Sequence, residues 1–83
     1  MTHIARTEKQ IGAILRRQRK QVGLSQAELA ERMHSRQGTI SRLESGVPAM
    51  QMRTLMEELV ALELELVIRP RSRSTQAEIE DIF

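Results

Sequence analysis

Residues 23–46 read GLSQAELAERMHSRQGTISRLESG, and this stretch decides the fold. Ser25 followed by Glu28 has the spacing of a capping box, in which each side chain satisfies a free backbone N–H at a helix start. Apolar residues then recur at helical spacing in two short runs that a brief break separates. A glycine and a nearby proline close the second run. The stretch therefore predicts a helix over 26–33, a tight turn, and a second helix over 36–45.

Two further helices are predicted to flank this pair. Apolar residues at helical spacing indicate a helix over 7–22, and Gly23 then supplies a residue that tolerates a left-handed turn. A fourth helix is predicted over 52–62, although Gln51 is a poor residue to begin it. Its expected inward face consists of Met52, Leu55, Met56, Leu59 and Val60. The fold class is therefore expected to be all-α, with four helices.

The spacing of the apolar residues changes after the fourth helix. Over 62–69 they alternate with mostly polar residues, which is the period of a strand with one buried face. A lone strand leaves its backbone groups unpaired and invites pairing with a second copy. We therefore predict a short C-terminal strand that pairs across a dimer, with contacts from Leu62, Leu64, Leu66 and Ile68. The alternative is that the fourth helix continues to residue 68.

The composition favours a partner with negative charge. The chain has 83 residues, a formal net charge of +2, one Phe, and no Trp, Tyr or Cys. Its basic residues gather at the front, where Glu8 alone opposes Arg6, Lys9, Arg16, Arg17, Arg19 and Lys20. This end suits a polyanion, although a solvated helix face explains such a cluster as well. Because single-stranded nucleic acid is usually held by stacking on aromatic rings, duplex DNA is the better candidate.

Other classes of function find no support in the sequence. His3 and His34 are far apart and have no cysteine or paired carboxylates at ligand spacing, so no metal is expected. No nucleophile, base and orienting group form a recognisable set, so we expect neither enzyme activity nor a cofactor. The absence of cysteine, of a long apolar run and of a signal-peptide pattern favours the cytoplasm and no membrane contact.

The domain is expected to span residues 1–69. Pro70 ends the regular pattern, and residues 70–83 are interpreted as a flexible basic linker followed by a short tail. A turn or two of helix in this tail would place three apolar residues on one side, namely Ile79, Ile82 and Phe83. Because the segment is too short for a stable isolated helix, it either frays or folds onto a partner.

From about residue 10 to residue 62 the chain resembles the Cro and phage-repressor (Xre) family of helix-turn-helix proteins. The resemblance lies in Gln26, Leu29 and Ala30 of the first helix of the pair, and in Gln37, Thr39, Ile40 and Ser41 of the second. It implies a repressor-like domain whose second helix lies in the major groove of DNA.

The resemblance also implies roles that the side-chain chemistry supports. Gln26 is expected to touch the DNA backbone and to brace Gln37, whose amide can pair with N6 and N7 of adenine. Arg19 and Glu44 are expected to form a partly buried structural ion pair. The full set of expected DNA-binding residues is Ser25, Gln26, Arg36, Gln37, Gly38, Thr39, Ser41 and Arg42.

Three residues of this chain differ from those usual in the family. Some of the differing features are found in one group of family members, the HipB-like antitoxins. His34 stands where glycine is usual, Ser35 where an apolar residue is usual, and Arg36 where a capping hydroxyl is usual. His34 is thus expected to hold a backbone conformation that favours glycine. A basic residue followed by Gln, a small residue, Thr, Ile and Ser is similar to HipB-like antitoxins, and so is the ending LVALELELVIRP at 59–70.

The similarity to HipB-like antitoxins implies a homodimeric repressor with two functions. The dimer would bind a palindromic operator of its own genes, and it would also bind and restrain a HipA-type kinase toxin or a related toxin. The alternative is a stand-alone transcriptional regulator of the phage-repressor type, without a toxin partner.

Overall fold

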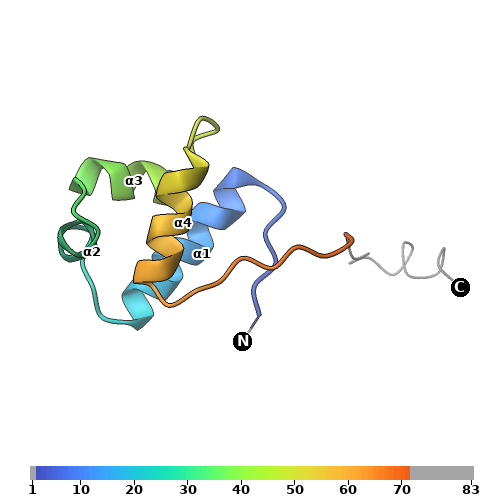
Figure 1. The fold of residues 1–83 in the computed structure, drawn as a ribbon, viewed down its shortest axis with the longest axis horizontal. Helices are drawn as coiled ribbons and strands as arrows, with labels where there is room; N and C mark the ends of the chain where they lie inside the picture. Colours follow the sequence, from blue (N-terminus) through green and yellow to red (C-terminus); the bar gives the residue numbers. More distant parts are fainter. Residues whose placement is uncertain (1, 72–83) are drawn as a thin grey trace, which may run out of the picture.

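The computed structural model describes residues 2–71, which fold into four helices and contain no strand (Figure 1). α1 spans Glu8–Gln21, α2 Gln26–Arg32, α3 Gln37–Ser45 and α4 Met52–Ala61. Each helix begins and ends within one residue of its predicted bounds, so the all-α class is confirmed. The predicted tail residues Ile79, Ile82 and Phe83 lie outside the described residues.

The helix starts differ in how their free N–H groups are satisfied. At α2 the predicted capping box is present: Ser25 Oγ accepts from the Glu28 N–H at 3.0 Å, and the Glu28 carboxylate accepts from the Ser25 N–H at 2.9 Å. The bond from the Ser25 backbone also lowers the pKa of Glu28. α3 and α4 begin at Arg36 and Gln51 without any side-chain cap. The first turn of each therefore keeps N–H groups free for other acceptors.

The four helices of the described part all end in a left-handed turn that satisfies their last carbonyls. The left-handed residues are Gly23, His34, Gly46 and Glu63, at φ 80°, 53°, 73° and 58°. The backbone conformation expected of His34 is thus confirmed. The turn from α2 to α3 is held by Ser35, whose N–H donates to the Ala30 carbonyl at 2.8 Å. Strain of about 1 kcal/mol accompanies a left-handed residue other than glycine.

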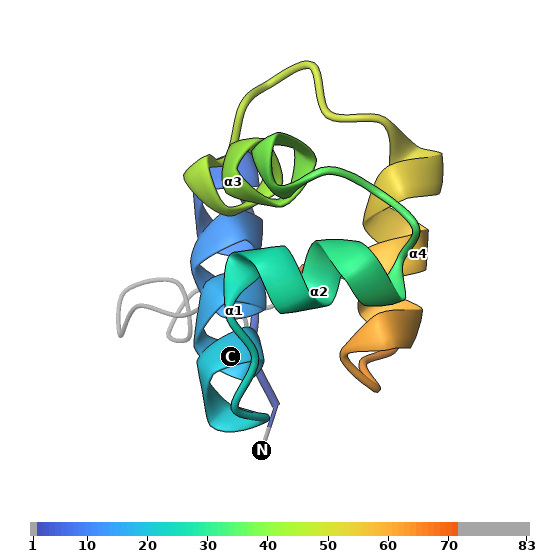
Figure 2. The same cartoon turned by 90° about the vertical axis from the view of Figure 1, so that its left-hand side faces the viewer.

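The core is built from residues of all four helices, and Figure 2 shows α2 running crosswise in front of α1 and α4. α3 packs against both α1 and α2. Gly12 of α1 permits this packing, because a Cβ there would lie 2.7 Å from the carbonyl oxygen of Leu43. The buried apolar residues are Leu15, Leu24, Leu29, Ala30, Ile40, Leu43, Leu55, Leu59 and Leu62. This packing holds α3 in one position with its outer face in solvent.

Two predictions about α4 and the segment after it are wrong. Met52, Met56 and Val60 were expected to face inward, but they are 64%, 42% and 76% exposed. The apolar arc of α4 is wider than the core can cover, so only its Leu55 and Leu59 side is buried.

Leu62 was predicted as the first residue of the dimerisation strand, but it ends α4 and is fully buried in its own chain. The helical period that places Leu55 inward also places Leu62 inward, one heptad later. Leu64 packs partly against the core, whereas Leu66 and Ile68 are 50% and 90% exposed. Residues 64–71 form no regular secondary structure in the single chain. A strand that pairs with a second copy can therefore begin no earlier than Leu64.

Candidate nucleic-acid interface

The outer face of α3 is polar and accessible. Ile40 and Leu43 are buried beneath it. Of the predicted residues, Gly38, Ser41 and Arg42 lie on the opposite side by the helical period; Gln37 at the start of α3 and Arg36, the residue before it, are exposed as well. Gly38 has open space around its Cα, so its lack of a side chain leaves a flat patch on this face. The structure thus brings four of the eight predicted DNA-binding residues together on the exposed side of α3, with Arg36 directly before them.

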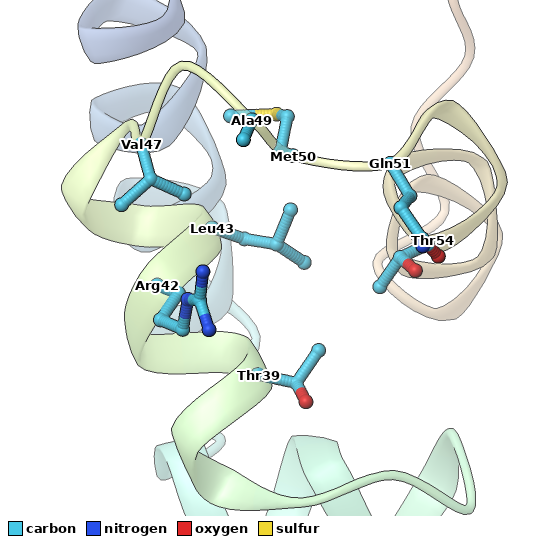
Figure 3. A pocket seen from close by; sticks show the side chains of 8 residues that line it. All are labelled: Thr39, Arg42, Leu43, Val47, Ala49, Met50, Gln51 and Thr54. Carbon is cyan, nitrogen blue, oxygen red and sulfur yellow. The ribbon is translucent and has the colours of Figure 1, made fainter.

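Thr39 lies at one edge of that face and is half-buried. Together with Arg42 it lines an open hollow of about 270 Å³ between α3 and the start of α4 (Figure 3). The loop after α3 forms the rest of the wall, and Gln51 and Thr54 close it on the α4 side. The hollow lies beside the outer face and presents hydroxyl, amide and guanidinium groups.

Beneath the outer face, Arg19 of α1 and Glu44 of α3 form the predicted ion pair. The Arg19 Nε lies 2.6 Å from Glu44 Oε2, and Nη2 donates to Oε1 at 3.1 Å. Nη1 of the same guanidinium donates to the carbonyl of Leu24 at 2.8 Å. Only 9% and 4% of the two side chains are exposed, and the hydrogen bond to Glu44 raises the pKa of Arg19. Arg19 is therefore a structural residue and no part of the basic surface.

A line of hydrogen bonds runs from this ion pair to the start of α3. Gln26 of α2 donates through Nε2 to Glu44 Oε1 at 3.1 Å. Gln37 in turn donates through Nε2 to Gln26 Oε1 at 3.4 Å. We call Arg19, Glu44, Gln26 and Gln37 the polar relay. The expected brace between the two glutamines is thus present, and its inner end lies on a buried charge pair.

The polar relay has a direction that chemistry imposes. An ionised carboxylate only accepts hydrogen bonds, so the Gln26 amide must turn its NH2 group toward Glu44. Its carbonyl oxygen then faces Gln37, which must answer with its own NH2 group. The Gln37 Oε1 and its second N–H therefore remain free for an outside partner, as one acceptor beside one donor.

The sequence alone did not reveal Glu58 of α4. Its side chain is fully buried, and neither carboxylate oxygen has a hydrogen-bond partner among the described residues. Burial raises its pKa to about 7; the charge of Glu44 acts in the same direction and that of Arg19 opposes it. The helical period carried the signal, because Glu58 stands between Leu55 and Leu62 on the inward side of α4.

A short helix, a tight turn and a second helix with an exposed polar face define a helix-turn-helix domain of the DNA-binding kind. The chain belongs to the helix-turn-helix family, whose model (HTH_3, Helix-turn-helix) matches residues 15–64. The resemblance to the Xre type is thereby confirmed. No curated protein matches the chain. No helix of residues 2–71 is long and apolar enough to cross a membrane.

Solved structures give the same fold. One, a complex of a substituted HipB with an O2 20mer, is 26% identical and superposes with a TM-score of 0.80 over 87% of this chain and 100% of that one. Another, "Structure of HipA-HipB-O2-O3 complex", is 25% identical, with a TM-score of 0.78 over 86% of this chain and 100% of its own. A third, "MDT Protein", has the same identity, coverage and TM-score as the second. The similarity to HipB-like antitoxins expected from the sequence is confirmed at the level of the fold.

Proposed function

We propose that this chain is a sequence-specific repressor that binds duplex DNA and reads its bases with α3. The observation that supports the proposal best is the fixed direction of the polar relay, which leaves an acceptor beside a donor at the exposed end of Gln37. That pair matches the N6 donor and N7 acceptor that adenine presents in the major groove. The function is binding rather than catalysis, and its place is the cytoplasm, where the DNA is.

The other residues of the outer face complete this binding surface. Arg36 and Arg42 reach guanine or nearby phosphates, and Gly38 lets the backbone of α3 approach the groove closely. Thr39 and Ser41 offer hydroxyls to a base or a phosphate. Ser25 and Gln26 meet the DNA backbone at the start of α2, where the helix N-terminus favours an anion. The uncapped start of α3 gives a second set of free N–H groups toward the same strand.

The repressor acts as a homodimer on a palindromic operator with half-sites about 34 Å apart. We propose that the residues from Leu64 to Arg69 of two copies pair as strands, with Leu64, Leu66 and Ile68 in the contact. Leu66, Val67 and Ile68 are exposed and apolar in the single chain, which supports this pairing. An apolar groove of about 390 Å³ runs beside Leu64 and Leu66, between α1 and α4, and can receive apolar residues of the second copy.

The dimer also serves as an antitoxin. We propose that it binds a HipA-type kinase toxin or a related toxin, because its fold matches that of HipB in a complex of HipA, HipB and O2-O3. In this proposal Ile79, Ile82 and Phe83 form a short segment that docks onto the toxin. The competing function is a stand-alone regulator, in which these three residues have no partner.

Selection of DNA from a random duplex pool tests the DNA-binding proposal. The full chain should enrich a palindrome, and Gln37→Ala should lose about 5-fold to 150-fold in affinity for it, the value of one bidentate base contact. Gln37→Ala should also accept other bases at the adenine position, while Arg42→Ala should weaken binding. The matched control is Gln21→Ala, at an exposed glutamine at the end of α1. Unchanged affinity in both α3 variants would refute the placement of the base-reading surface.

Co-purification tests the antitoxin proposal. The chain is expressed with its chromosomal neighbours and isolated through a salt wash that removes DNA. A stoichiometric kinase-like protein that is lost when residues 71–83 are deleted would support the antitoxin and give the tail its role. Recovery of the chain alone would leave the stand-alone regulator.

A further inference from the structure

Glu58 is buried without a hydrogen-bond partner among the described residues, and the charges at the inner end of the polar relay act on its carboxylate. The charges that act on its carboxylate are those of Glu44 on α3 and Arg19 on α1, and the uncharged amide of Gln26 on α2 donates to Glu44. On its own helix, Arg53 and Glu57 are 91% and 54% exposed and pair with each other at 3.9 Å. Glu58 is therefore the only member of the buried charge cluster, among the described residues, that lacks a bonded partner.

The arrangement suits a neutral Glu58. Three nitrogens of Arg19 are engaged, two with Glu44 and one with the carbonyl of Leu24. An ionised Glu58 would place a second buried carboxylate beside one guanidinium, with no donor of its own. Desolvation raises the pKa of Glu58 to about 7, so both forms are accessible near neutrality.

The two forms of Glu58 act differently on Arg19. The protonated carboxyl leaves the guanidinium to Glu44, and the polar relay then stands as observed. The ionised carboxylate attracts Arg19 and repels Glu44, and both forces weaken the bonds that join those two side chains. Because Gln26 donates to Glu44 and Gln37 donates to Gln26, a displaced Glu44 removes the restraint on the base-reading amide.

We propose that Glu58 is a positioning residue for base reading: its proton keeps Arg19 paired with Glu44 and thereby holds Gln37 in its reading orientation. The inference rests on the proposed DNA-binding function and adds that the protonation state of Glu58 regulates specific binding. Specific binding favours the protonated form of Glu58. By linkage, specifically bound DNA must therefore raise the pKa of Glu58. Contacts to phosphates do not need an oriented Gln37, so non-specific binding lacks this dependence.

The test compares a palindrome selected at about pH 6 with an unrelated duplex, from about pH 6 to about pH 8 at constant ionic strength. The ratio of specific to non-specific affinity should fall as pH rises, by up to about tenfold for each unit by which DNA raises the pKa of Glu58. In Glu58→Gln, which keeps the side-chain shape and cannot ionise, the ratio should stay at its low-pH value. Glu57→Gln removes a carboxylate from the exposed side of α4, and in this variant the ratio should still fall as pH rises.

The series is repeated in a His3→Asn, His34→Asn background, which removes both histidines; asparagine tolerates the left-handed backbone at position 34. Gln37→Ala should remove the pH response of the ratio. A ratio that is flat in the parent chain, or that falls equally in Glu58→Gln, would overturn the inference while leaving DNA binding intact. Failure to enrich any duplex would instead overturn the proposed function.

A measurement without DNA keeps the inference testable in that event. In the free protein, the NMR signals of the Arg19 Nε–H and the Gln26 side-chain amide should shift together as pH rises from about 6 to about 8. In Glu58→Gln these two signals should not change with pH, whereas in Glu57→Gln they should shift as in the parent chain. Signals that ignore pH in the parent chain would refute the link between Glu58 and the polar relay.

Discussion

Replacing Glu58 by Gln should stabilise the protein at high pH and leave it nearly unchanged at low pH. The carboxyl is fully buried without a hydrogen-bond partner among the described residues, and its pKa rises from 4.5 to about 7. Between these two values the folded state binds more protons than the unfolded state, so stability falls as pH rises through this window. A tenfold change in proton affinity is worth about 1.4 kcal/mol, so the full loss is about 3 kcal/mol.

Denaturant unfolding at about pH 5 and about pH 8, at fixed protein concentration, measures this effect. The parent chain should lose about 3 kcal/mol between the two conditions through Glu58, and Glu58→Gln should recover most of it at the higher pH. Glu57→Gln, on the exposed side of the same helix, should change the unfolding free energy by less than about 0.5 kcal/mol at either pH. A Glu58→Gln variant destabilised equally at both pH values would refute the reasoning, because it would mean that the carboxylate has a partner.

Four further outcomes are expected. Arg19→Met leaves Glu44 buried without its partner and should cost about 3 to 5 kcal/mol in denaturant unfolding, whereas a loss below about 1 kcal/mol would mean that water reaches the carboxylate. His34→Gly relieves a left-handed backbone and should raise the unfolding free energy by up to about 1 kcal/mol; a lower melting temperature would show that the imidazole packs usefully. Ile68→Lys should shift a sedimenting dimer toward monomer, and an unchanged dimer would place the interface elsewhere. The logarithm of DNA affinity should fall by about 0.9 per neutralised phosphate for each tenfold rise in salt, and a flat response would exclude phosphate contacts.

Local signals made the helices predictable from the sequence. The capping box at Ser25 and Glu28 involves residues three apart, so its chemistry is visible without the fold. The left-handed backbone of His34 was expected from the family resemblance, because glycine is usual at that position. The ion pair of Arg19 and Glu44 spans 25 residues, and only the family resemblance brought it into view.

The wrong predictions concern α4 and Leu62, where the helical period alone does not determine which residues are buried. Periodicity gives the direction of an apolar residue but not the width of the surface that covers it, so Met52, Met56 and Val60 were placed inward. Leu62 fits both the helical period before it and the alternating period after it. In the structure it follows the helical period, because its side chain is buried in the core at the end of α4. Glu58 was passed over because a carboxylate is rarely buried, and burial without a bonded partner is rarer still.

The link between the core and α3 changes how mutations of this protein must be interpreted. Arg19, Glu44 and Glu58 lie beneath the proposed DNA-binding surface, and Arg19 and Glu44 are bonded into the line that ends at Gln37. A variant of any of the three can therefore lose specific binding without touching DNA. Such a variant changes the unfolding free energy as well, whereas Gln37→Ala removes one exposed amide and should change it by less than about 0.5 kcal/mol. Loss of base preference at unchanged stability is thus the signature of a reading residue, and joint loss of both is the signature of the support beneath it.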